Sequence, residues 1–198
     1  MTINGDPHMK NRSIYQGEPA GGYRNYIVPI LVSVIISLMP WPDIVLSGTR
    51  GVLLDREVYI QKILLGDNLL NYFYFGSFLD YFTSEYSWWF LMKMLEDGRL
   101  PVSYETVFQI ISTIFLATSA LIVYRRGRLL PLVFLANPLV FELAYSQLRS
   151  ALAISILYLV YLFLRRSIYI AIALCLFAAT IHTTMIIFVA VYVLCLMT

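Results

Sequence analysis

The chain has 198 residues, of which 60% are hydrophobic and 13% are charged, and its net charge is +2. Soluble domains have about 45–50% apolar and about 25% charged residues, so this composition excludes an ordinary soluble fold and predicts an integral membrane protein. The small net charge gives no sign of a nucleic-acid partner. Cys175 and Cys195 lie in apolar runs without metal-ligand spacing, which indicates small buried side chains rather than a metal site or a disulfide.

We expect an all-α fold, namely a polytopic membrane helical bundle in which residues 23–198 form a single membrane domain. Residues 1–22 are polar and predict a cytoplasmic N-terminal tail. The apolar run after this tail has no small-residue cleavage pattern, so we interpret it as an uncleaved anchor. Because a spanning helix needs about 20 mostly apolar residues, about 5–6 transmembrane helices are expected. They cover residues 23–40, 104–124, 129–145, 148–164, 168–181 and 183–197.

Two of these apolar runs are interrupted. Asn137-Pro138 falls within the third expected helix. The run at residues 168–197 is too long for one comfortable span, and it contains the polar stretch Thr180-Ile181-His182-Thr183-Thr184. That stretch predicts two short helices that meet near His182, and a single tilted helix is the alternative.

Lysine and arginine residues form three clusters at the ends of the expected helices. The clusters are Lys10, Arg12 and Arg24 before the first helix, Arg125, Arg126 and Arg128 after the second, and Arg165 and Arg166 after the fourth. With six helices, all of these charges fall on one face of the membrane, and the positive-inside rule makes that face cytoplasmic. Both termini are then cytoplasmic.

Residues 41–103 form a long extracytoplasmic loop with five Lys or Arg residues and eight Asp or Glu residues. The loop is rich in aromatic residues. Residues 55–65 place Val58 and Leu65 on one face at helical spacing. Residues 85–95 do the same with Trp88, Trp89, Leu91, Met92 and Leu95. We interpret both segments as amphipathic helices that lie at the membrane interface.

Ionisable residues at membrane depth are costly and are therefore candidates for function. Glu142, Arg149 and His182 stand in apolar surroundings at the non-cytoplasmic ends of the expected helices. The long loop on that face adds Asp55, Arg56 and Glu85. A purely structural ion pair between Glu142 and Arg149 is the alternative to a functional site.

An arginine near the interface suits a phosphate group, because its planar fork makes two parallel hydrogen bonds and stays charged when water is removed. A carboxylate or a histidine beside it suits removal of a proton from a sugar hydroxyl. A diphosphate is already a good leaving group and needs little acid catalysis. This combination is what a sugar transferase with a lipid-diphosphate donor requires, and the aromatic residues of the loop can stack on sugar rings.

Five short motifs carry a family resemblance. In chain order they are Asp55-Arg56-Glu57-x-Tyr59, Ser84-Glu85, Asn137-Pro138, Leu148-Arg149-Ser150-Ala151-Leu152-Ala153 and Ile181-His182. Their order and rough spacing over about residues 26–195 resemble the EpsG/Wzy group of O-antigen and exopolysaccharide polymerases. Tyr86 stands where that family usually has Pro, and Ser150 where it usually has Gln. Family members usually continue for several more helices, so the resemblance implies an N-terminal half or a short relative.

The resemblance implies a metal-independent glycosyltransferase, without a cofactor, in the bacterial inner membrane. Its reaction would transfer a glycan from undecaprenyl diphosphate to the next lipid-linked repeat unit at the outer face. The implied partners are membrane lipid, the undecaprenyl-diphosphate-linked oligosaccharide and other polysaccharide assembly proteins. His182, Asp55 and Glu85 are the candidate catalytic residues, with the base left open among them, and Arg149, Arg56, Glu142 and Tyr59 are the candidate substrate-binding residues.

Two other functions remain as alternatives. A short membrane protein of this kind could instead bind or inhibit a full-length polymerase without being an enzyme. A flippase or transporter of lipid-linked glycans is the third reading. Transporters usually have repeated architecture and polar residues along a through-path. Here the polar residues gather at one face, which favours the polymerase.

Overall fold

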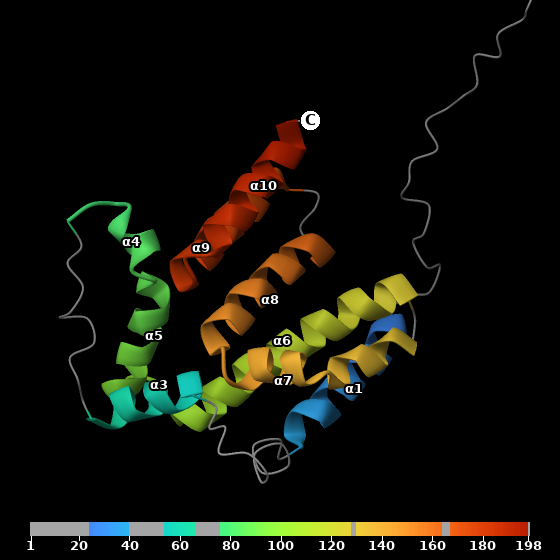
Figure 1. The fold of residues 1–198 in the computed structure, drawn as a ribbon, viewed down its shortest axis with the longest axis horizontal. Helices are drawn as coiled ribbons and strands as arrows, with labels where there is room; N and C mark the ends of the chain where they lie inside the picture. The colour runs from blue at the N-terminus through green and yellow to red at the C-terminus, as the bar shows by residue number, and fades with distance from the viewer. Residues whose placement is uncertain (1–23, 40–53, 66–75, 128–129, 164–166, 198) are drawn as a thin grey trace, which may run out of the picture.

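The computed structural model describes residues 24–39, 54–65, 76–127, 130–163 and 167–197, and every regular element in these ranges is a helix (Figure 1). The all-α class is therefore confirmed for the described part of the chain. The expected tail at residues 1–22 lies outside it. So do parts of the expected loop at residues 41–103.

The central element is α6 (Tyr104–Gly127), a helix of 24 residues. It packs against α1 (Arg24–Leu38) and α8 (Leu148–Phe163). Polar side chains also join α6 to the neighbouring helix Pro138–Tyr145. Ser112 Oγ, which is fully buried, donates to the Ala144 carbonyl 2.7 Å away. In a membrane protein such side-chain bonds substitute for the hydrophobic drive that lipid cannot supply.

The stretch expected as one helix at residues 129–145 consists of two elements. A 3-10 helix, η2 (Leu130–Ala136), is followed by α7 (Pro138–Tyr145). The Asn137 side chain accepts a hydrogen bond from the Leu139 N–H at 2.9 Å and so caps the start of α7. Proline has no N–H to donate and is favoured in a first helical turn, which explains why the chain restarts at Pro138.

α7 and α8 meet at an angle of 101°. The bend lies at Ser146 and Gln147, so Arg149 falls in the first turn of α8, directly after the bend. Figure 1 shows α8 running off at an angle from α7 after this point.

α9 (Ile168–Ile181) and α10 (Met185–Met197) form a helical hairpin. Val189 of α10 packs into the cluster around Cys175 of α9, and both residues are seven positions from His182. The backbone at His182 is extended, with φ −146° and ψ 115°. The structure therefore has two helices with His182 at the turn, and not the single tilted helix.

One described helix, Tyr104–Arg125, is long and apolar enough to cross a membrane. The bent pair α7 and α8 is a second candidate if it counts as one broken or re-entrant span. The apolar segments Tyr26–Leu38 and Ile168–Ile181 are shorter. The expected count of about 5–6 spans therefore stays a prediction, made from the length that a span requires.

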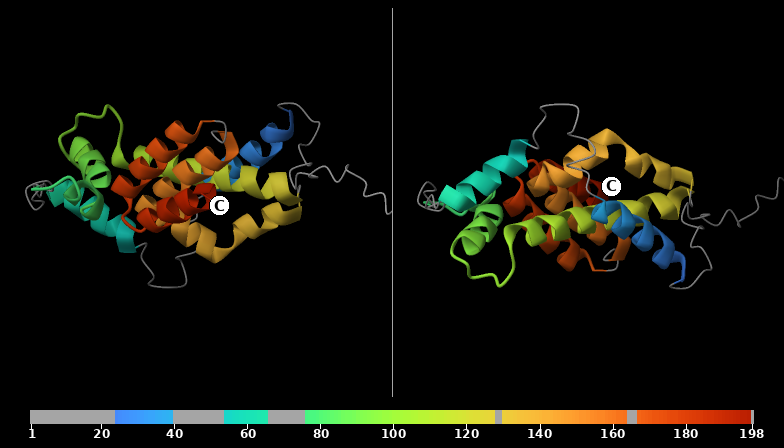
Figure 2. Two further views of the ribbon diagram at one scale, coloured as in Figure 1. Left: turned by 90° about the horizontal axis from the view of Figure 1, so that it is seen from above. Right: turned by 90° about the horizontal axis from the view of Figure 1, so that it is seen from below.

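The remaining helices are α3 (Leu54–Leu65), α4 (Asp80–Thr83) and α5 (Tyr86–Glu96). They group at the end of the molecule where α6 begins (Figures 1 and 2). On α3, Val58 and Leu65 are 44% and 75% exposed and Tyr59 is 4% exposed, so Tyr59 packs inward and the placement of the Val58 and Leu65 face at the membrane interface stays a prediction. On α5, Trp88 and Met92 lie in the core.

Candidate functional site

Glu85 lies at the junction of α4 and α5 in a left-handed conformation, with φ 55° and ψ 45°. Among the described residues it is the one non-glycine residue with a positive φ. Such a conformation costs on the order of 1–3 kcal/mol and persists only where surrounding contacts hold it. The Glu85 carbonyl begins α5 by accepting from the N–H groups of Trp88 and Trp89, at 3.1 and 3.2 Å.

The Glu85 carboxylate connects three segments that are distant in the sequence. Its Oε2 pairs with Nη1 of Arg149, in the first turn of α8. Its Oε1 lies 2.5 Å from Nδ1 of His182 and accepts a hydrogen bond from the Thr183 N–H at 3.3 Å. These contacts require all three segments at once, which accounts for the backbone strain at Glu85.

The electrostatic balance at Glu85 favours the ionised carboxylate. Burial by itself raises the pKa of Glu85, since a charge is costly away from water. The hydrogen bond to His182, the Arg149 charge and the Thr183 N–H act in the opposite direction. Their combined effect lowers the pKa below its ordinary value of 4.5. Glu85 is therefore an anion at neutral pH and a poor proton acceptor.

Arg149 lies over the ring of Tyr59, with its Cζ atom 5.7 Å from the ring centroid. Tyr59 is itself held by Trp88 and Phe108, whose ring centroids are 5.0 and 6.5 Å away. Burial raises the pKa of Tyr59 to about 12, so its hydroxyl stays neutral. The guanidinium is thus fixed between a carboxylate and an aromatic face, which is a favourable position for a cation.

The turn that carries His182 is anchored to the segment around Glu85. Thr183 Oγ1 donates to the Phe82 carbonyl at 3.1 Å. Ser87 Oγ and Thr180 Oγ1 lie 2.7 Å apart and join α5 to α9. These hydroxyl contacts were not expected from the sequence, although the polar stretch at residues 180–184 was noted. They fix the imidazole relative to the carboxylate.

The other expected site residues lie outside this cluster. Glu142, on α7, is exposed and makes no ion pair within 4.0 Å in the part of the chain that the structure describes. The alternative pair of Glu142 with Arg149 is therefore wrong, because the carboxylate beside Arg149 is that of Glu85. Asp55 is half-buried one turn before Tyr59 and likewise has no ion pair with a described residue.

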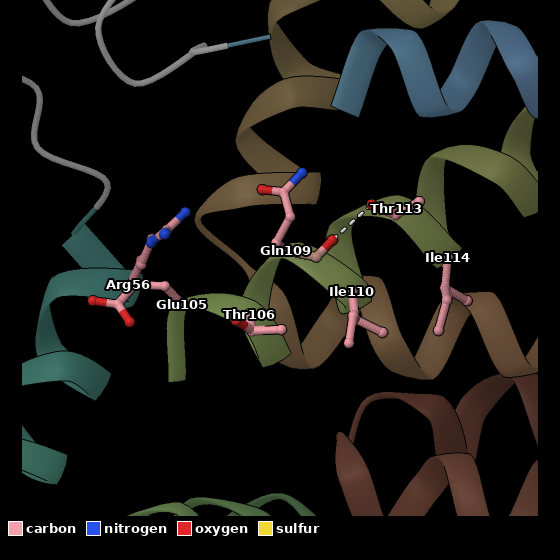
Figure 3. Close-up of a pocket in the computed structure, with 7 residues that line it drawn as sticks. All are labelled: Arg56, Glu105, Thr106, Gln109, Ile110, Thr113 and Ile114. Carbon is pink, nitrogen blue, oxygen red and sulfur yellow. Dashed lines mark hydrogen bonds between the residues drawn. The ribbon is translucent and has the colours of Figure 1, made fainter. Parts of the chain in front are cut away.

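Arg56, also on α3, has its Cζ atom 5.8 Å from the centroid of the Phe108 ring. It lines a pocket of about 500 Å³ between α3 and α6 (Figure 3). The other lining residues are Glu105, Thr106, Gln109, Ile110, Thr113 and Ile114. The sequence reading missed Glu105, Gln109 and Thr113, although their spacing of four residues puts them on one face of a helix.

Within the described residues, no three His, Cys, Asp or Glu side chains are placed to hold a metal ion. The cluster instead combines one carboxylate, one guanidinium, one imidazole and one phenol. Such a set can bind an anion at the guanidinium and accept a proton at the imidazole.

Comparison with known proteins gives one match. The family model described as "EpsG family" matches residues 25–196 of the chain. No curated protein and no solved structure matches it. The matched range includes Tyr59, Glu85, Arg149 and His182.

Proposed function

Because the chain belongs to the EpsG family of membrane proteins of polysaccharide biosynthesis, we propose that it polymerises lipid-linked oligosaccharide repeat units. The reaction is glycosyl transfer from undecaprenyl diphosphate at the outer face of the bacterial inner membrane. The observation that carries the proposal is the contact of Glu85 with both Arg149 and His182.

Arg149 binds the diphosphate of the donor. A guanidinium has five N–H donors, and Glu85 is paired with only one of its nitrogens. The remaining donors and the positive end of the α8 dipole form a positive region at the bend. When the glycan C1–O bond breaks, the electron pair passes to the diphosphate, whose negative charge this region stabilises.

His182 accepts the proton of the acceptor hydroxyl. Its Nδ1–H is oriented by Glu85, so Nε2 is the nitrogen with a lone pair, and no described residue hydrogen-bonds to it. The acceptor hydroxyl gives its proton to Nε2 as its oxygen bonds to C1 of the growing glycan. The Glu85 carboxylate stabilises the imidazolium that results, as a carboxylate does behind other catalytic histidines. Of the three candidate bases, we therefore assign this role to His182 and an orienting role to Glu85.

The position of Arg125 supports the orientation that the proposal needs. Its Nη1 donates to the Leu162 carbonyl at 3.4 Å, near the carboxyl end of α8. Arg149 lies at the opposite end of this 16-residue helix, which at 1.5 Å per residue is about 24 Å long. An arginine on the cytoplasmic side and a site on the outer side agree with the positive-inside rule. We accordingly propose a multi-pass protein with a cytoplasmic N-terminus.

The test is complementation of a polymerase-deleted host with the full chain. We expect the wild type to restore long polysaccharide chains and R149Q to leave single repeat units, as measured by the chain-length distribution on gels. R99Q is the matched control, because Arg99 is 68% exposed and pairs with Asp97 away from the site. Full activity in R149Q would overturn the diphosphate assignment.

The same experiment separates the polymerase from its alternatives. A non-enzymatic partner would restore no chains alone and would change chain length only when a complete polymerase is also expressed. A flippase would instead change the amount of lipid-linked repeat unit that reaches the outer face. Either result would count against the proposed reaction. Co-purification with other polysaccharide assembly proteins would identify the partners that the proposal expects.

A further inference from the structure

A second polar site lies between α3 and α6, apart from the cluster around Glu85. Its volume of about 500 Å³ is within the range of about 300–1,000 Å³ that small-molecule sites occupy. Arg56 lines it from α3, and the other lining residues come from the first three turns of α6 (Figure 3). Two aromatic rings, those of Tyr59 and Phe108, separate this pocket from Arg149.

Arg56 is a partly desolvated cation without a close carboxylate. Burial lowers the pKa of Arg56, and the charges of Glu57 and Glu105 act in the opposite direction. Neither carboxylate forms an ion pair with it, since no described residue pairs with Arg56 within 4.0 Å. A guanidinium does not lose its proton in proteins. Its N–H groups are therefore available to oxygen atoms of a ligand in the pocket.

The α6 wall of the pocket combines polar and apolar groups in a regular way. Glu105, Gln109 and Thr113 form a polar stripe at intervals of four residues, and Ile110 and Ile114 lie beside it. Polar residues are costly within a helix long enough to span a membrane, so Gln109 and Thr113 require partners, whereas Glu105 is an exposed acid in the first turn of α6.

Packing against α1 explains Gln109 and Thr113 in this stripe but does not explain Glu105. The Gln109 amide donates to the Ser37 carbonyl, and Thr113 Oγ1 donates to Ser37 Oγ at 3.1 Å, so both hold α1. Glu105 lies at the exposed start of α6 and joins no other helix by an ion pair among the described residues. Its carboxylate is hydrogen-bonded by Tyr104 and Ser103 beside it, and it lines the pocket together with Arg56.

We propose that this pocket is a glycan subsite, which binds a sugar residue of the substrate through ring hydroxyls. Hydroxyls both accept and donate, so they match the donors of Arg56 and the acceptor oxygens of Glu105. The two isoleucine side chains face the apolar C–H surface of the ring. This inference rests on the proposed function, because it takes the ligand to be part of the same oligosaccharide.

The distance to the first site fits an oligosaccharide. The Arg149 Cζ atom is 5.7 Å from the Tyr59 centroid, the Tyr59 and Phe108 centroids are 6.5 Å apart, and the Arg56 Cζ atom is 5.8 Å from the Phe108 centroid. A chain of a few sugar residues spans two aromatic rings. The subsite therefore holds sugars remote from the bond that breaks, and its binding energy positions the reacting residue.

The test uses the purified full chain in detergent and two probes measured separately by titration calorimetry. One probe is the free repeat-unit oligosaccharide, released from the lipid carrier of the host, and the other is undecaprenyl diphosphate without a glycan. We expect R56Q to weaken binding of the free oligosaccharide by at least about tenfold, as loss of hydrogen bonds to a charged group does. Binding of undecaprenyl diphosphate should be unchanged, and R56K should recover part of the loss.

K62Q is the matched control, because Lys62 is on the same helix but lies 4.5 Å from the Trp89 ring and does not line the pocket. E105Q supplies a second test if R56Q does not fold, since Glu105 is exposed. Wild-type affinity for the oligosaccharide in both R56Q and E105Q would overturn the subsite, and so would failure of the wild type to bind it. R149Q separates the two proposals, because it should weaken only the undecaprenyl diphosphate. If it does not, the proposed function fails independently of the subsite.

Discussion

His182 Nδ1 lies 2.5 Å from Glu85 Oε1, although the two residues are 97 positions apart in the chain. The carboxylate is ionised, so it is the acceptor in this contact and Nδ1 carries the proton. The tautomer of His182 is thereby fixed, and Nε2 is left as the basic nitrogen. In the His182 ring, Nδ1 therefore makes the structural contact with Glu85, and Nε2 is the nitrogen proposed to accept the proton.

Asparagine and glutamine substitutions separate these two roles. An asparagine amide can take the place of Nδ1–H, so H182N should keep the contact with Glu85 and unfold at nearly the wild-type temperature. Polymerisation should nevertheless fall by about 10²–10⁴-fold, because the general base is lost. H182Q loses the contact as well as the base and should also unfold earlier. Thermal unfolding and polysaccharide chain length measure the two effects, and wild-type chains from H182N would show that Nε2 is not the base.

The lowered pKa of Glu85 predicts how stability depends on pH. The carboxylate stabilises the fold fully above its ordinary pKa of 4.5. This contribution is lost as the pH falls below 4.5 and through the lower folded-state pKa. We expect the difference in unfolding temperature between the wild type and E85Q to be largest at neutral pH and to shrink in this acid range. E142Q, which removes an exposed carboxylate, is the control, and a difference that does not depend on pH would contradict the ionised state.

Tyr59 contacts Arg149 with its ring face and also by a side-chain hydrogen bond, and we expect the ring contact to have the larger effect. Y59F keeps the face that lies under Arg149 and should retain most of the stability and of the polymerisation. Y59L keeps apolar volume but removes the cation–π contact, which contributes about 0.5–2 kcal/mol. We expect Y59L to shorten the polysaccharide chains and to lower the unfolding temperature modestly. Equal activity of Y59F and Y59L would show that the ring does not position Arg149.

The hydroxyl pair of Ser87 and Thr180 should stabilise the docking of α5 on α9. A double-mutant cycle with S87A, T180A and the double variant isolates their interaction. We expect a coupling of about 0.5–1.5 kcal/mol in unfolding free energy, which is the usual net contribution of a hydrogen bond. Ser103 and Thr106 form an exposed pair within one turn at the start of α6 and serve as the control. Additive effects of S87A and T180A would mean that the two hydroxyls do not interact in solution.

The sequence predicted which residues belong to the site, but it did not predict which of them contact one another. Arg149 and His182 stood out, together with Glu142, because ionisable groups are rare in apolar surroundings, whereas Glu85 was a candidate only as part of the long loop. The partner of Arg149 could not be read from spacing. Glu142 is the nearer carboxylate in the chain, but the fold brings Glu85, at the start of α5, to Arg149 at the start of α8. The left-handed backbone at Glu85 also has no signal in residue type, because glycine and asparagine are the residues usually found there.

The helix boundaries could likewise be predicted where neighbouring residues determine them, and not where contacts with distant segments do. The separate helices on each side of His182 follow from a local polar stretch, and α7 begins where Asn137 and Pro138 indicate. The deep burial of Tyr59 was not expected, because the apolar pattern of α3 points to Val58 and Leu65. An aromatic ring with one polar atom can be buried deeply when neighbouring rings and a cation surround it.

The contacts of Glu85 also have a consequence for biogenesis. Glu85 is synthesised 64 residues before Arg149 and 97 residues before His182. Until both arrive at the translocon, the carboxylate lacks the groups that make its burial favourable, and an unpaired buried charge is strongly disfavoured. We therefore expect α3 and α5 to wait at the aqueous surface during insertion and to dock only after the helical hairpin of α9 and α10 is made. Nascent chains arrested before His182 should consequently be cleaved faster by protease near Glu85 than chains arrested after Met197.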